Sequence, residues 1–378
     1  MSLDIREFAT PPCELLALGE PAHPTQEPAF GAIRNELFES LAGQGFRSIA
    51  LETDRVAALA VNDFVQGGAG TLDAAMDAGF SHGFGDLEAN RRLVAWMRAY
   101  NEGRPAGQRL TLHGFDAPTE NTSAPSPRRY LEFVCAYLGF DLDLASLLGA
   151  DERWSRAEAV LNPAMSIGAG SDAVRLRAVA DDLLTSLYMR APELIAATSR
   201  ADWDRARIQL AAGLGLLRYH RQAARQVEES ARISGLLATR DVLMAQHLLD
   251  IRDLERQRGA TLVFANIAHL QRNPSSMRMA GMDVRWSSAG SILSSLLGRR
   301  YAVVAGSLGR SAALGLGEPE PGTYEGFLQR RTTTRSLTPT AEIPPAHIRT
   351  DTGPGLAYAP LSRETVDSAD AILHVGAV

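Results

Sequence analysis

Residues 15–23 read LLALGEPAH, and this stretch decides the fold that the rest of the sequence indicates. The apolar run 15–18 is typical of a short buried strand, and Gly19 ends it. Glu20 and His23 follow where the chain leaves the strand. Ligands bind outside the carboxyl ends of strands in open α/β sheets, and a charge there is costly without a partner or a task. We therefore expect Glu20 and His23 to belong to a functional site.

The residues that follow complete a βαβ unit. Segment 33–41 carries apolar residues at helical spacing, and Gly43 and Gly45 end the helix that it predicts. Strand 48–51 comes next and runs into Glu52. Both strands of the unit are thus followed by a carboxylate at the same edge of the predicted sheet.

Four further strands are predicted along the chain. The third strand, 110–116, ends in Asp116, and the fourth, 261–265, runs into Asn266 and His269. The last two strands are expected at 301–305 and 371–375.

Between the third and fourth strands the pattern changes to long helices. They are expected at 128–138, 173–188, 202–227 and 233–256. The sequence therefore predicts an α/β protein with a largely parallel central sheet flanked by helices, and a helical cap region inserted over the carboxyl edge. The expected division is 1–118 as the first part of the α/β core, 119–239 as the cap and 240–378 as the second part of the core. Segment 331–357, rich in Thr, Pro and Gly, is expected to be a long loop over the site.

Composition excludes several classes of protein. The 378-residue chain has a net charge of −6, whereas nucleic-acid-binding proteins usually carry positive charge. No apolar run reaches the roughly 18 residues of a membrane span, and the amino terminus does not resemble a signal peptide. Cys13 and Cys135 fit buried free thiols in a reducing cytoplasm better than a disulfide. All 38 basic residues are arginine, which excludes Schiff-base lysine chemistry and a Walker-type phosphate site.

Glu20, His23 and Glu27 form the pattern E-x-x-H-x-x-x-E. A carboxylate near an imidazole orients it and raises its basicity, which suits a general base acting on water or an alcohol. On helices this pattern is usually solvated or salt-bridged, but here it follows a strand directly. The same side chains could hold zinc, yet the two histidines one turn apart that metalloproteases need are absent. We predict no bound metal and no cofactor.

Glu52, Asp116 and His269 follow other strands and should face the same edge. A carboxylate in such a place can also cap a helix or pair with a buried arginine, so each has a structural alternative. His113, inside a strand, is expected to be packed, and the role of His82, in a loop-rich segment, stays open. The residues expected to converge as catalytic groups are Glu20, His23, Glu52 and His269. Those assigned to substrate binding are Glu27, Arg34, Arg55, Asp116 and Asn266.

These residues resemble those of the erythromycin esterase family, which includes homologues labelled as succinoglycan biosynthesis proteins. The family motif G-E-x-x-H-G-x-x-E is matched by Gly19, Glu20, His23 and Glu27, and the arginine of the next helix by Arg34. Five further family motifs cover nearly the whole chain: G-F-x-x-[IV]-A-x-E at 45–52, W-x-R-x-Y-N at 96–101, G-x-D at 114–116, R-D-x-x-M-A at 240–245 and L-G-x-x-Y at 297–301.

The resemblance implies hydrolysis of a macrolide lactone by a water-derived nucleophile, without a serine acyl-enzyme. It implies that His23 is the general base, positioned by Glu20 and Glu52, with His269 nearby.

The chain departs from the family at two positions. Asn266 stands where the family has the first histidine of A-H-N-x-H, and asparagine does not titrate near neutral pH. Pro24 replaces the glycine after His23, which fixes φ and removes a backbone N–H donor. Three functions therefore stay open: hydrolysis of an ester or lactone of a natural product, non-hydrolytic tailoring in which a substrate amine or hydroxyl replaces water in an intramolecular cyclisation, and non-catalytic antibiotic binding. In each the partner is a small molecule, not nucleic acid or a membrane, and a protein partner is unknown.

Overall fold

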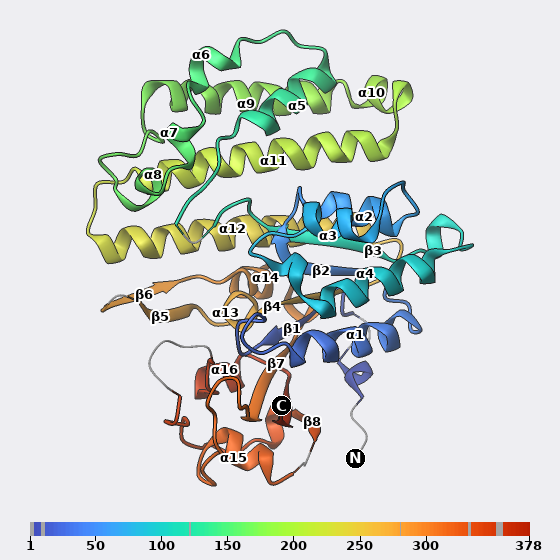
Figure 1. The fold of residues 1–378 in the computed structure, drawn as a ribbon, viewed down its shortest axis with the longest axis vertical. Helices are drawn as coiled ribbons and strands as arrows, with labels where there is room; N and C mark the ends of the chain where they lie inside the picture. The colour runs from blue at the N-terminus through green and yellow to red at the C-terminus, as the bar shows by residue number, and fades with distance from the viewer. Residues whose placement is uncertain (1–3, 9–11, 121, 280, 332–333, 353–357) are drawn as a thin grey trace.

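Seven strands form one sheet in the order β3-β2-β4-β1-β7-β9-β8, as seen in a computed structural model of the chain (Figure 1). The structure describes residues 4–8, 12–120, 122–279, 281–331, 334–352 and 358–378. The strands of the sheet are β1 (Leu15–Glu20), β2 (Ser48–Asp54), β3 (Thr111–Asp116), β4 (Thr261–Asn266), β7 (Tyr301–Arg310), β8 (Arg335–Pro339) and β9 (Ala371–Ala377). Every pair is parallel except β8 with β9.

β1 lies at the centre of the sheet, between β4 and β7. Its register pairs Gly19 with Ala265 of β4 and with Ala305 of β7, and Glu20 with Asn266. The carboxyl ends of β1 and β4 therefore meet at one edge, as expected for parallel neighbours. This register is what brings together side chains from distant parts of the chain.

Side chains of the central strands alternate between two cores, because successive residues of a strand point to opposite faces. On one face Leu16 and Leu18 belong to a core that includes Phe38, and on the other Leu15 and Ala17 belong to a core that includes Leu248. The first face is covered by α1 (Ala29–Ala42), α2 (Ala58–Val65), α3 (Leu72–Gly79) and α4 (Glu88–Asn101). The second is covered by α12 (Glu229–Glu255), α13 (Ile267–Leu270), α14 (Ala289–Leu297), α15 (Tyr324–Gln329) and α16 (Arg363–Asp367).

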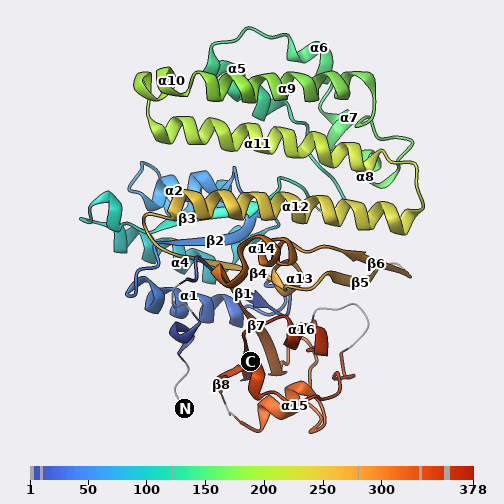
Figure 2. The ribbon, with the colours of Figure 1, turned by 180° about the vertical axis from the view of Figure 1, so that it is seen from behind.

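The remaining α-helices form a layer beyond α12 with a core of its own (Figures 1 and 2). Trp154, Leu176 and Trp203 are buried in it. These helices are α5 (Arg128–Leu138), α6 (Leu144–Leu148), α7 (Glu152–Ser155), α8 (Ala157–Leu161), α9 (Ser171–Met189), α10 (Ala191–Ala197) and α11 (Arg200–Ala223). The expected boundary between residues 239 and 240 falls inside α12, so one continuous helix joins the cap to the sheet.

Smaller elements complete the chain. A two-stranded antiparallel ribbon projects beside α12 (Figure 1) and consists of β5 (Ser275–Met279) and β6 (Met282–Trp286). Short 3-10 turns are η1 (Ile5–Glu7), η2 (Phe84–Asp86), η3 (Ala106–Gln108), η4 (Gly298–Arg300) and η5 (Thr340–Glu342).

The expected sheet is confirmed, and one expectation about a loop is wrong. All six predicted strands are present as parallel members of the sheet. Segment 331–357 is not loop throughout, because β8 occupies Arg335–Pro339 and pairs with the outer edge of β9. Pro339 ends that edge strand, a position where a missing N–H is tolerated. Two parts of the expected loop, 332–333 and 353–357, lie outside the described residues.

Two expectations from composition concern membranes and thiols. Within the described residues, no helix combines the length and apolar character needed to cross a membrane. Cys13 and Cys135 are both free thiols, Cys135 buried and Cys13 half-buried.

The close approach of Gly19 to α13 gives a stability test. A Cβ at Gly19 would lie 2.5 Å from Ile267 Cδ1 and 3.0 Å from Ile267 Cα. We expect Gly19→Ala to destabilise the fold by roughly 1–3 kcal/mol, the usual effect of overpacking. Gly107→Ala is the matched control, because a Cβ there meets no atom within 4 Å. Equal urea midpoints for the two variants would contradict the close packing of β1 on α13.

Candidate functional site

A pocket opens at the carboxyl ends of β1 and β2 and encloses about 540 Å³, the solvent at its mouth included. Its polar lining includes Glu20, Glu52 and Arg34. Much of the remaining wall is apolar or aromatic: Pro24, Pro28, Leu51, Phe80, Phe84, Leu87 and Phe264. Apolar walls with a few converging polar groups are typical of small-molecule sites.

Glu20 is the most deeply buried of the acidic groups in the pocket. It is the last residue of β1, its exposed fraction is 3%, and no described residue donates to or accepts from its Oε2. Burial raises its pKa well above the usual value, and nearby Glu52 adds to this while Arg34 opposes it. The raised pKa of Glu20 favours its neutral form, and its Oε2 has no partner among the described residues.

Arg34 supplies a buried cation to the same pocket. Its Nη1 donates to Asn90 Oδ1 at 2.8 Å, and its Nε and Nη2 donate to Asn35 Oδ1. The guanidinium lies 4.9 Å from the centre of the Phe264 ring. Two amides and an aromatic face therefore fix its position. Burial lowers the pKa of Arg34 to about 10, and nearby Glu20 opposes this shift.

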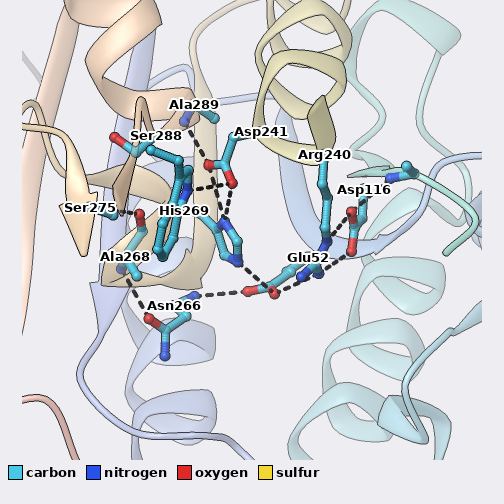
Figure 3. A network of polar contacts seen from close by, with 12 residues as sticks. Glu52, Asp116, Arg240, Asp241, Asn266, Ala268, His269, Ser275, Ser288 and Ala289 are labelled. Carbon is cyan, nitrogen blue, oxygen red and sulfur yellow. Dashed lines mark hydrogen bonds and ion pairs between the residues drawn. The ribbon is translucent and has the colours of Figure 1, made fainter. Parts of the chain in front are cut away.

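A second polar network lies behind Glu52 (Figure 3). Glu52 Oε2 accepts the Asn266 backbone N–H at 2.9 Å, and Oε1 accepts from Arg240 Nη2 at 3.2 Å. Arg240 also donates from Nε to Asp116 Oδ1 at 2.9 Å and from Nη2 to Oδ2. Burial alone would raise the pKa of Asp116, but Arg240 and His82 lower it below its usual range. Arg240 therefore bridges carboxylates from two neighbouring strands, and it lowers the pKa of Asp116.

His269 lies between Glu52 and Asp241 (Figure 3). Its Nδ1 is 3.0 Å from Asp241 Oδ2, and its Nε2 is 3.5 Å from Glu52 Oε1. Asp241 is fully buried and also accepts the indole N–H of Trp286 at 2.9 Å and the Ala289 N–H at 2.7 Å. Burial lowers the pKa of His269, but Asp241 and Glu52 outweigh it, and the net shift is upward.

His23 lies at the mouth of the site and is exposed. Its Nδ1 is 2.8 Å from Thr25 Oγ1, and its ring centre is 5.6 Å from that of Phe84, which lines the pocket. Among the described residues, the His23 ring thus forms its hydrogen bond with the Thr25 hydroxyl and not with Glu20 or Glu52.

Like Asp116, three more residues assigned to substrate binding pair within the protein, and their assignment stays a prediction. Glu27 accepts from the Ser311 hydroxyl at 2.6 Å and from the Ala29 N–H at 3.3 Å. Arg55 is buried and pairs with Asp250 of α12.

The third, Asn266, acts as the N-cap of α13. Its Oδ1 accepts the Ala268 N–H at 2.9 Å, the usual role of an asparagine at this position.

Sequence reasoning did not assign a role to Arg240, Asp241 or Asn90. The R-D-x-x-M-A motif was the sequence feature that contained Arg240 and Asp241. A motif does not show how α12 is rotated, and this rotation is what points both side chains towards the strand ends. Asn90 gave no signal, because it acts through Arg34 and the Phe84 carbonyl.

The described side chains do not form a metal-binding cluster. Among them, no group of three or more His, Cys, Asp and Glu residues is arranged to hold an ion. The expectation of a metal-free protein stays a prediction for elemental analysis.

The chain matches one protein family over most of its length. A model of the erythromycin esterase family matches residues 41–375. No curated protein sequence matches this chain.

Three solved structures share the fold. A mutant of the erythromycin esterase EreC in its open conformation has a TM-score of 0.65 at 19% identity, with 100% of this chain and 95% of that chain covered. A succinoglycan biosynthesis protein has a TM-score of 0.66 at 14% identity, and a protein from Bacillus cereus has 0.64 at 15%. Both comparisons cover 99% of this chain and 90% of the other.

Glu20 gives a test of pH-dependent stability. Because the folded state raises its pKa, the stability from its bound proton is present below the unfolded value of about 4.5 and is lost as pH rises through the folded value. Glu20→Gln mimics the neutral acid, so we expect it to melt above the parent at pH 8 and to approach the parent near pH 4.5. Exposed Glu39→Gln is the control, and identical pH profiles for parent and Glu20→Gln would contradict a buried neutral acid.

Asp241 gives a second test. Asp241→Asn removes the charge that raises the pKa of His269, so that pKa should fall in an NMR titration of the ring. Breaking a buried ion pair should also destabilise the protein by about 3 kcal/mol or more. The loss should be largest below pH 6.5 and smaller above the folded pKa of His269, where the imidazole is neutral. Exposed Asp283→Asn should do neither, and an unmoved His269 titration in Asp241→Asn would count against the pair.

Proposed function

Because this chain belongs to the erythromycin esterase family, we propose that it is a hydrolase that cleaves an ester or lactone bond in a natural product such as an antibiotic. The observation that carries the proposal is the pocket in which Glu20, Glu52 and Arg34 converge at the strand ends. The fold shared with EreC supports it.

His23 is the proposed general base. Its contact with Thr25 engages Nδ1 and leaves Nε2 to take a proton from water at the mouth of the pocket. The oxygen of that water then forms a bond to the ester carbonyl carbon, and the carbonyl oxygen becomes an oxyanion.

Glu20 and Arg34 are the proposed partners of that oxyanion. A neutral carboxylic acid can donate a hydrogen bond from an apolar wall, and a fixed guanidinium offers positive charge where negative charge develops. Both groups are preorganised, because Glu20 ends the central strand and Arg34 is held by Asn35 and Asn90.

His269 is the proposed source of the proton for the leaving group. The carboxylates of Asp241 and Glu52 on its two sides favour the imidazolium form. The carbon–oxygen bond to the alcohol breaks as the oxyanion collapses, the alkoxide takes a proton, and an acid and an alcohol leave.

Cyclisation without hydrolysis is the second candidate. Two observations favour it: Asn266 caps a helix in place of a titratable histidine, and the pocket wall is largely apolar, which limits access of water to the reacting bond. In that reaction His23 takes the proton of a substrate amine or hydroxyl, which displaces the leaving group within the same molecule.

Isotope labelling separates the three functions. In H₂¹⁸O a hydrolase incorporates one heavy oxygen into the acid product, whereas a cyclase gives an unlabelled ring. A non-catalytic binding protein leaves the ester or lactone unchanged in a stable complex.

His23→Asn tests the proposed base. We expect hydrolysis of an ester probe to fall by roughly 10²–10⁴, the usual contribution of a positioned base. The melting temperature should stay within a degree or so, because exposed surface side chains contribute little to stability. His347→Asn, another exposed histidine, should change neither quantity. Unchanged turnover per folded molecule in His23→Asn would refute the assignment.

A further inference from the structure

Segment 80–87 forms one wall of the pocket, through Phe80, Phe84 and Leu87. It is tied to the end of β2 by Ser81, whose N–H donates to Thr53 Oγ1 at 2.8 Å. The Ser81 hydroxyl also accepts the backbone N–H of the last residue of β2 at 2.9 Å. The pocket wall is therefore a connection held by side chains rather than part of the sheet.

His82 occupies an unusual backbone conformation in this wall. Its φ is +58°, and among the described residues it is the non-glycine residue with a positive φ. Residues in this region are strained and persist where their surroundings hold them, so the contacts of His82 should explain why it is there.

Both ring nitrogens of His82 face carboxylates. Nδ1 is 2.8 Å from Glu120 Oε2, and Nε2 is 3.0 Å from Asp116 Oδ2. Since a carboxylate can only accept, this geometry favours a ring that donates from both nitrogens, which is the imidazolium. Its side chain is 11% exposed.

Among the described residues, Arg240 also acts on His82, and it shares Asp116 with it. Burial and Arg240 lower the pKa of His82, but Asp116 and Glu120 outweigh them, and the net shift is upward. With both nitrogens engaged, this imidazolium has no free position for proton transfer.

The ring of Phe84 connects His82 to the proposed base. Its centre lies 5.6 Å from that of His82 and 5.6 Å from that of His23. The Phe84 carbonyl accepts from Asn90, which in turn accepts from Arg34. Moving segment 80–87 would therefore shift the aromatic surface against which His23 rests.

We propose that His82 is a positioning residue: its two ion pairs, to Asp116 and Glu120, clamp segment 80–87 as the pocket wall and so set the place of Phe84 beside His23. The part that concerns His23 rests on the proposed function, and the part that concerns the wall does not.

Hydrogen exchange of the amides in 80–90 tests the clamp without any substrate. His82→Asn is the variant of choice, because asparagine tolerates a positive φ but cannot carry the charge. After correction for the chemical rate, we expect these amides to exchange roughly tenfold to a hundredfold faster, the equivalent of lost charge-assisted hydrogen bonds. In the parent the same acceleration should appear as pH rises through the raised pKa of His82, and in His82→Asn it should be absent.

His113→Asn is the matched control. His113 also pairs with a buried glutamate, Glu255, at 2.8 Å, but on β3 away from the wall. It should leave exchange in 80–90 unchanged. Parent-like exchange in 80–90 of His82→Asn at every pH would overturn the proposal.

Glu120→Gln serves if His82→Asn does not fold, since Glu120 is 54% exposed and its loss leaves the buried pair intact. Glu120→Gln should also accelerate amide exchange in 80–90, but by less than His82→Asn. Unchanged exchange in this variant would overturn the clamp.

Kinetics with an ester probe then tests the link to His23. The KM of the parent should rise with pH as His82 loses its proton, whereas in His82→Asn it should be high and independent of pH over this range. Fast exchange in His82→Asn together with no turnover by the parent would refute the proposed hydrolase and leave the clamp standing. Turnover with a KM profile unaltered in His82→Asn would refute the link to His23.

Discussion

The guanidinium of Arg240 is the interaction on which the site depends. Glu52 lies two residues before the end of β2, and Asp116 ends the neighbouring strand β3. The two carboxylates would repel each other or take up protons in a dry interior without a cation between them. Arg240 bonds to both. Because it projects from α12, the same contact joins the helical layer to the strand ends. A buried ion pair of this kind adds little net stability, and its value lies in fixing where each carboxylate stands.

The carboxyl groups of the site lie in two different environments, one on each side of Glu52. Behind Glu52, Arg240 and His82 lower the pKa of Asp116, and Asp241 raises the pKa of His269. In front of it, Glu20 faces an apolar wall, and burial raises its pKa. Glu20 and Asp116 both end strands of the sheet, and their surroundings shift their pKa values in opposite directions. Pairs of titratable groups with separated pKa values are a common arrangement for acid–base chemistry.

Segment 80–87 shows how side-chain contacts can fix the shape of a connection between helices and strands. Segment 80–87 has neither sheet pairing nor a long helix to hold it, so its shape comes from Ser81, His82 and the Phe84 carbonyl. Such connections carry function in many α/β proteins because the sheet provides a rigid base and the loops provide the chemistry. Here the strain at His82 is balanced by two ion pairs, which ties the wall to β3 and to the loop after it.

The sequence by itself determined the order of elements and where charge would meet the sheet. Apolar runs located the strands, and the residues after them, such as Glu20 and Glu52, were expected at the strand ends because parallel strands share an edge. Only the tertiary structure decided which partner each charge takes. Arg55 follows β2 directly but turns to Asp250, Glu27 turns to Ser311, and Arg240 reaches Asp116 and Glu52 across 124 and 188 residues of sequence. The physical reason is range: local hydrophobic periodicity sets secondary structure, whereas a side-chain contact depends on strand order and on the rotation of a helix packed against it.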